Sequence, residues 1–208
     1  DHIAVKENAL TIVRDDLRRK VQRGVGATGA MSDPYNPLER KLGLTRHALE
    51  LLSAYGFGVA VDTKSDLVSR DADVLSEIAA QMPALVKFSI TTADPALAAR
   101  LEPGAPSPER RFAAMEQLAK AGVFTGLLLM PVLPGLTDNR ENLSRLLRQT
   151  AEAGGRFCYC WPGLTMREGQ REYFYQALDR EFPGLREKYE KRYGTRYRCT
   201  VPGAAKLY

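Results

Sequence analysis

Short apolar runs alternate along the chain with longer stretches in which apolar residues recur every three or four positions. The runs, which have the length and β-branched character of buried strands, are residues 25–31, 57–62, 85–91, 124–132 and 157–161. The longer stretches, which have helical periodicity, are residues 10–21, 38–55, 72–81, 108–121 and 142–153. Cap residues followed by Pro or Glu predict helix starts at Asn36, Asp94, Ser107 and Asp138.

The spacing of the runs predicts how the strands are joined. Successive runs begin about 30 to 40 residues apart, which is the length of a βαβ unit. The runs are apolar on both faces, which is typical of a parallel sheet that is covered on both sides. We therefore expect an α/β fold with a mostly parallel sheet.

The number of strands limits the architecture. Five runs, with residues 2–6 as a further extended piece, are too few for a closed eight-stranded barrel, which needs about 250 residues. An open doubly wound sheet and a partial barrel remain, and in both the functional residues lie just past the carboxyl ends of the strands. From residue 167 the pattern changes to helices rich in Tyr and in charge. We expect a barrel-like domain over residues 1–166 and a C-terminal helical cap over residues 167–208.

Composition narrows the class of protein. The 208 residues include 30 Lys and Arg against 25 Asp and Glu, a formal net charge of +5, and 44% are hydrophobic, which suits a folded globular chain. No apolar stretch approaches the ~20 residues of a membrane span. Basic and acidic residues alternate, so the charge permits a polyanionic partner without requiring one. Three cysteines are too few for a disulfide-stapled secreted module, and we expect a cytoplasmic protein.

Polar residues follow several of the predicted strands. Ser32 and Asp33 follow the first strand, Lys64 follows the second, and Ser89 lies at the end of the third. Because the carboxyl ends of parallel strands meet at one edge of a sheet, we expect these four residues to surround a shared site.

Two of these residues have more than one interpretation. The Lys64 ammonium suits a grip on a carboxylate or phosphate, or a Schiff-base amine, and the alternative is a salt bridge to Asp33, Asp62 or Asp66. Asp33 precedes Pro34 and suits a turn residue as well as a ligand.

The cysteines and histidines give weaker signals. Cys158 and Cys160 share one face of a strand with Tyr159 on the other, and two thiols without a second pair complete neither a zinc site nor an iron–sulfur cluster. We interpret them as ordinary thiols, regard Cys199 as peripheral, and predict no metal ligands in this chain. His47 lies beside the apolar stripe of a helix, where a structural role is expected.

Six strings follow one another in the order of a known family. They are Gly-Ala-Met-Ser-Asp-Pro-Tyr-Asn-Pro (29–37), Thr-Lys-Ser (63–65), Phe-Ser-Ile-Thr-Thr (88–92), Leu-Glu-Pro-Gly-Ala-Pro-Ser-Pro-Glu (101–109), Met-Pro-Val-Leu-Pro-Gly-Leu-Thr-Asp (130–138) and Arg-Glu-Gly-Gln-Arg-Glu-Tyr-Phe-Tyr (167–175). Together they resemble the radical S-adenosylmethionine (SAM) proteins of the spore-photoproduct-lyase-like family. The resemblance covers nearly the whole chain.

This resemblance implies a fold and a chemistry. The fold is a partial (β/α)6 TIM-like barrel, incomplete here at the N-terminus. In the family a 4Fe–4S cluster, held by a C-x3-C-x2-C loop, and SAM generate a 5′-deoxyadenosyl radical that abstracts hydrogen from the substrate. Lys64 and Ser89 match positions that contact SAM in spore photoproduct lyase, and Ser32 and Asp33 complete the expected cofactor-binding set. The implied partners are SAM, a reductant such as flavodoxin or ferredoxin, and nucleic acid as a candidate substrate in DNA repair.

The chain departs from the family pattern at two places. It contains no C-x3-C-x2-C loop and opens at Asp1 rather than Met, so we expect the loop upstream and this chain alone to be inactive. The hydrogen-donating cysteine of spore photoproduct lyase stands two residues before the Ser-Asp pair, where this chain has Ala30. This argues against thymine-dimer reversal by that route and leaves Cys160 as a substitute donor.

Two other functions remain as alternatives. One is a cluster-less module that binds a nucleoside or a partner protein at the barrel mouth. The other is an aldolase-like barrel with Lys64 as the Schiff-base amine, which the absence of paired acid and base residues around Lys64 disfavours.

Overall fold

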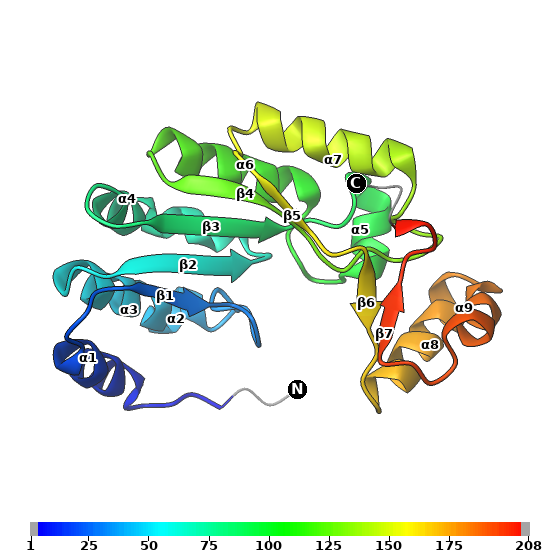
Figure 1. The fold of residues 1–208 in the computed structure, drawn as a ribbon, viewed down its shortest axis with the longest axis horizontal. Helices are drawn as coiled ribbons and strands as arrows, with labels where there is room; N and C mark the ends of the chain where they lie inside the picture. Colours follow the sequence, from blue (N-terminus) through cyan, green and yellow to red (C-terminus); the bar gives the residue numbers. More distant parts are fainter. Residues whose placement is uncertain (1–3, 205–208) are drawn as a thin grey trace.

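The computed structural model describes residues 4–204, and its centre is a five-stranded parallel sheet in the order β1-β2-β3-β4-β5. The strands are β1 (Val25–Thr28), β2 (Gly58–Thr63), β3 (Ala84–Ser89), β4 (Phe124–Leu129) and β5 (Cys158–Cys160). Each strand pairs with its neighbour in sequence, so the sheet is part of a barrel that does not close (Figure 1). The predicted partial TIM-like barrel is confirmed. Residues 1–3, and with them part of the extended piece expected at 2–6, lie outside the described residues, and residues 4–6 form no strand.

One helix precedes β1, and the others connect the strands. They are α1 (Ala9–Arg19), α2 (Glu39–Leu42), α3 (Leu44–Ala54), the 3-10 helix η1 (Asp66–Asp71), α4 (Ala72–Ala79), α5 (Pro95–Leu101), α6 (Pro108–Lys120) and α7 (Arg140–Glu152). The single helix predicted over residues 38–55 is divided because Gly43 adopts a left-handed conformation, with φ of 61°, between α2 and α3. The side chain of Asn139 caps α7, in place of the predicted Asp138, which instead accepts from the Gly135 N–H.

The two faces of the sheet have different surroundings. Val61, Val86 and Leu127 are fully buried in the core, and helices α3, α4, α6 and α7 contact these strands. On the opposite face Tyr159 is 59% exposed and Phe124 is 48% exposed. The prediction that both faces are buried is therefore wrong. Right-handed crossovers place the connecting helices on one side of a barrel-type sheet, and the inner side stays partly open.

The C-terminal part has a core of its own. Strands β6 (Gly163–Thr165) and β7 (Arg198–Thr200) pair antiparallel, and α8 (Gln170–Glu181) and α9 (Leu185–Tyr193) lie beside them (Figure 1). Their buried side chains form a second cluster that includes Leu164, Leu178, Tyr189 and Cys199. The segment predicted as helical thus also contains a strand, which pairs with β6 of the preceding segment. Among residues 4–204, none of the helices has both the length and the apolar character that crossing a membrane requires.

Candidate functional site

A cleft of about 1130 Å³ opens where the strands of the main sheet end. Its walls come from the loops after β1, β2, β3 and β4 and from the segment around β6 and β7. Ser32, Asp33, Lys64 and Ser89, which the sequence places at three separate strand ends, all line this cleft. The structure therefore brings the four predicted site residues together.

The loop after β1 reaches the cleft through a tight turn at Gly29. Its φ is +100°, and a Cβ atom there would overlap the backbone carbonyl of Asp62 in β2. Glycine is required on both counts, because side chains rarely adopt this φ and no room exists for one. This close approach lets the loop fold back over the end of β2 and carry Ser32 to the cleft.

Asp33 anchors this loop to the second strand. One carboxylate oxygen accepts from the Tyr35 N–H at 2.9 Å and from the Thr63 hydroxyl at 2.7 Å. The other accepts from the Lys64 N–H at 2.7 Å. With three donors from its own chain, Asp33 acts as a turn and anchor residue that sets where Ser32 and Lys64 lie.

A network of charged residues holds the same loop through Tyr35. It consists of Tyr35, Glu39, Arg46, Arg70 and Asp71, and we call it the loop network. Asp71 is fully buried, accepts from the Tyr35 hydroxyl at 3.1 Å, and pairs with Arg46 at 3.2 Å and Arg70 at 2.7 Å. Arg70 also pairs with buried Glu39 at 2.8 Å. Burial, followed by the Asp71 carboxylate, raises the pKa of Tyr35, so its phenol stays protonated. None of these five residues lines the cleft.

Lys64 belongs to a second network, the cleft network of Lys64, Glu102 and Arg111. The Lys64 ammonium lies 2.7 Å from Glu102 Oε1, and Glu102 Oε2 lies 2.7 Å from Arg111 Nη2. Lys64 and Glu102 both line the cleft. The predicted salt bridge of Lys64 is real, but its partner comes from the segment after α5.

None of the three carboxylates considered for Lys64 from the sequence is its partner. Asp33 contacts the Lys64 backbone rather than its ammonium. Asp62 pairs with Lys87 and Asp66 pairs with Arg110. Residues close in sequence to Lys64 are thus engaged elsewhere, and only the fold brings Glu102 within reach.

Polar side chains from β2 and β3 line the cleft, although both strands lie in mostly apolar runs of the sequence. Asp62 and Lys87 are register partners on β2 and β3, and their side chains pair at 2.6 Å. One step towards the carboxyl ends, Ser89, Leu128 and Tyr159 form a row across β3, β4 and β5. Lys87 is not among the site residues predicted from the sequence. The available signal was a charge inside an apolar strand, two residues before Ser89.

The part of the cleft lined by the C-terminal segment is aromatic and basic. Trp161, Phe174, Tyr197 and Arg198 line this part of the cleft. A hydrogen bond from Arg167, together with the nearby Arg198 charge, lowers the pKa of Tyr197. Aromatic rings beside guanidinium groups suit a planar ligand that carries negative charge.

The cysteines lie away from the cleft. Cys158 and Cys160 pack against the main core and do not line the cleft, and burial raises the pKa of Cys158 to about 11. Cys199 is buried in the second core. The suggestion that Cys160 donates hydrogen into the cleft is therefore wrong. Within residues 4–204, no three His, Cys, Asp or Glu side chains are grouped to hold a metal, so these residues do not fit a 4Fe–4S cluster.

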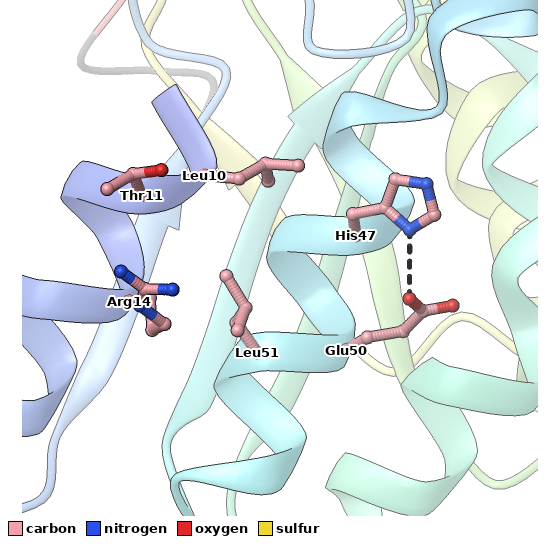
Figure 2. Close-up of a pocket in the computed structure, with 6 residues that line it drawn as sticks. All are labelled: Leu10, Thr11, Arg14, His47, Glu50 and Leu51. Atoms are coloured by element: carbon pink, nitrogen blue, oxygen red, sulfur yellow. Dashed lines mark hydrogen bonds and ion pairs between the residues drawn. The ribbon is translucent and has the colours of Figure 1, made fainter. Parts of the chain in front are cut away.

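A smaller hollow of about 350 Å³ lies between α1 and α3 on the helical side (Figure 2). His47 lies 3.0 Å from Glu50 here, and both side chains are about half exposed. The six lining residues are Leu10, Thr11, Arg14, His47, Glu50 and Leu51. None of them is a Ser or Cys nucleophile, which favours the structural interpretation of His47.

Comparisons with known proteins agree with this geometry. The model of the radical SAM superfamily matches residues 5–147. An uncharacterized protein of Mycobacterium tuberculosis is 34% identical over 192 residues, which are 92% of this chain and 56% of the relative. An uncharacterized protein of Methanocaldococcus jannaschii is 30% identical over 136 residues, 65% of this chain and 49% of the relative. The chain thus spans about half the length of these relatives.

Solved structures show the same fold. Spore photoproduct lyase complexed with dinucleoside spore photoproduct matches with a TM-score of 0.66 at 16% identity, over 97% of this chain and 60% of the other. Native anSMEcpe with bound AdoMet and Cp18Cys peptide matches with a TM-score of 0.53 at 15% identity, over 97% of this chain and 56% of the other.

Proposed function

Because the chain belongs to the radical SAM superfamily, we propose that it forms the SAM-binding core of an enzyme that abstracts hydrogen from a nucleic-acid substrate. One observation carries this proposal: Ser32, Lys64 and Ser89 come from three strand ends and line one cleft. In this role the Lys64 ammonium binds the methionyl carboxylate of SAM, and the two serine hydroxyls bind polar groups nearby. SAM supplies the chemistry, reductive cleavage to a 5′-deoxyadenosyl radical, while this chain binds and orients it.

The cluster ligands are part of the proposal and lie outside the described residues. Residues 4–204 do not fit a 4Fe–4S cluster: Cys158 and Cys160 pack against the main core, and Cys199 is buried in the second core. We expect a C-x3-C-x2-C loop elsewhere in the protein and expect this chain alone not to cleave SAM. The proposed setting is the cytoplasm, with a flavodoxin or ferredoxin as the reductant.

Nucleic acid is the proposed substrate because of the aromatic and basic part of the cleft. Trp161 and Tyr197 offer ring faces, and Arg198 offers a cation beside them. Residues 167–208 contain ten Lys and Arg against six Asp and Glu, so four of the five net positive charges of the chain lie in this part. The structural relative is named for a complex with a dinucleoside photoproduct, and a DNA lesion is the narrowest form of the proposal.

The test uses the intact protein, purified without oxygen. We expect bound iron and sulfide, a broad brown absorbance, and release of 5′-deoxyadenosine when a reductant and SAM are added. A matched preparation of the Lys64→Ala variant should retain the iron and release much less 5′-deoxyadenosine. Protein that stays colourless after complete iron–sulfur reconstitution would contradict the proposal.

One observation favours a second function. Because residues 4–204 group no metal ligands, a cluster-less module that binds a nucleoside or a partner at the same cleft is the alternative. The coding sequence beyond this chain discriminates between the two. A C-x3-C-x2-C loop there excludes the cluster-less module.

A further inference from the structure

A buried guanidinium connects two of the strand ends that carry candidate SAM ligands. Arg111, on α6, has a side chain that is 2% exposed. Its Nη1 donates to the carbonyl of Ser89 at 2.6 Å, and its Nε donates to the carbonyl of Pro106 at 2.9 Å. Its Nη2 pairs with Glu102 Oε2 at 2.7 Å. One side chain thus fixes the end of β3 and the carboxylate that faces Lys64.

Glu102 links buried Arg111 to Lys64 in the cleft. Its side chain is 15% exposed, and the oxygen not used by Arg111 lies 2.7 Å from the Lys64 ammonium. Burial alone would raise the pKa of Glu102, but Lys64 and Arg111 outweigh it, and the pKa is lowered. The carboxylate therefore stays ionised near neutral pH and holds both cations.

The cleft network has one positive charge in excess, and its Lys64 ammonium can donate further hydrogen bonds. Lys64 and Arg111 carry two positive charges against the one negative charge of Glu102. An ammonium has three N–H donors, so Lys64 can keep Glu102 and still donate to a second carboxylate. Its side chain is 42% exposed, which leaves room for that contact on the cleft side.

We propose that Glu102 and Arg111 are positioning residues for the carboxylate of SAM. They fix the Lys64 ammonium before the ligand arrives, so binding does not have to order a long flexible side chain. Arg111 contacts no ligand itself and acts through Glu102 and the Ser89 carbonyl. This inference rests on the proposed function and adds the residues that set the geometry of its cofactor site.

The experiment compares two ligands that differ by one group. Titration calorimetry on the intact protein measures the affinity for SAM and for decarboxylated SAM, which lacks the carboxylate. We expect Glu102→Gln to weaken SAM binding by about five- to tenfold and decarboxylated SAM binding by less than about twofold. Glu109→Gln is the matched control, because exposed Glu109 lies nearby on α6 and its replacement removes the same charge. It should change neither affinity.

A double-mutant cycle shows whether Glu102 acts through Lys64. In a Lys64→Met background, Glu102→Gln should have no further effect on SAM binding, because the residue it positions is gone. Glu102→Asp keeps the buried charge beside Arg111, but its side chain is too short to reach both cations. It should therefore also weaken the binding of SAM more than the binding of decarboxylated SAM. This variant decides the question if Glu102→Gln does not fold.

The outcomes separate this inference from the proposed function. If the unchanged protein binds neither ligand, both are overturned. If it binds SAM and Glu102→Gln weakens both ligands equally, Glu102 is only structural and the inference alone is overturned. Tighter SAM binding by Glu102→Gln would also overturn it, because Glu102 would then compete with the ligand instead of positioning Lys64.

Discussion

Two networks of charged residues hold the loops around the cleft, and they differ in the balance of positive and negative charge. In the loop network Arg46 and Arg70 face Glu39 and Asp71, and Arg46 also reaches exposed Asp73. In the cleft network Lys64 and Arg111 face Glu102 alone. In the first network carboxylates outnumber the two guanidinium groups, because Arg46 pairs with Glu50 as well, and the network lies off the cleft. The second network presents a half-exposed ammonium to the cleft. From this difference in charge we expect the loop network to act in stability and the cleft network to act in binding.

The largest expected effect is on the loop network. Asp71→Ala should lower the free energy of unfolding by about 3–5 kcal/mol, because Arg46, Arg70 and the Tyr35 hydroxyl lose the fully buried carboxylate that they share. Urea unfolding monitored by circular dichroism measures this loss. Asp73→Ala is the control: its side chain is 63% exposed, so the loss should stay within about 1 kcal/mol. Equal losses in the two variants would show that burial of Asp71 does not matter.

The cleft network should respond in binding rather than in stability. Lys64→Ala should weaken SAM binding by about 1.5–3 kcal/mol, roughly ten- to a hundredfold, because a charge-assisted contact is lost. Stability should change by less than about 1 kcal/mol, since Glu102 keeps Arg111. Lys120→Ala, on the exposed end of α6, is the matched control. If Lys64→Ala destabilises the fold and leaves SAM affinity unchanged, the two networks have the same role.

The sequence predicts the main sheet because each of its strands is an apolar run bounded by turn residues. It does not predict β6 and β7, which are as short as β5 but, unlike β5, do not lie in one of the apolar runs. It also does not distinguish the two faces of the sheet. Lys87 is the exception within its apolar run, and its charge marks the open face.

The candidate site could be predicted only in part. Ser32, Lys64 and Ser89 are recognisable because polar residues at strand ends converge in a parallel sheet. Glu102 and Arg111 are not, because one follows a helix and the other lies within a helix whose charges suggest a solvated face. Tertiary packing buries Arg111 at the end of β3, and no local pattern contains that information.

The smallest expected effects concern pH, and they compare Glu102 of the cleft network with Asp73, the exposed partner of Arg46. The pKa of Glu102 lies below its ordinary value of 4.5, so its contribution to stability is present above that pH and is lost as pH falls through the lowered pKa. Arg46 likewise lowers the pKa of exposed Asp73 from 3.8 to about 2, and that contribution is lost between these values. Unfolding free energies measured at several pH values below about 5 should therefore fall less steeply in Glu102→Gln than in the unchanged protein.

Salt then distinguishes the buried carboxylate from the exposed one. The Asp73 contribution, a few tenths of a kcal/mol, should disappear at about 1 M salt, where charges are screened beyond ~3 Å. The Glu102 contribution should persist, because its side chain is only 15% exposed, against 63% for Asp73, and buried pairs are screened much less by salt. Asp73→Asn and Glu102→Gln, compared at low and high salt, give the two contributions separately. If salt removes both to the same extent, the cleft network is as open to solvent as the Asp73 pair, and Glu102 cannot hold Lys64 in a fixed position.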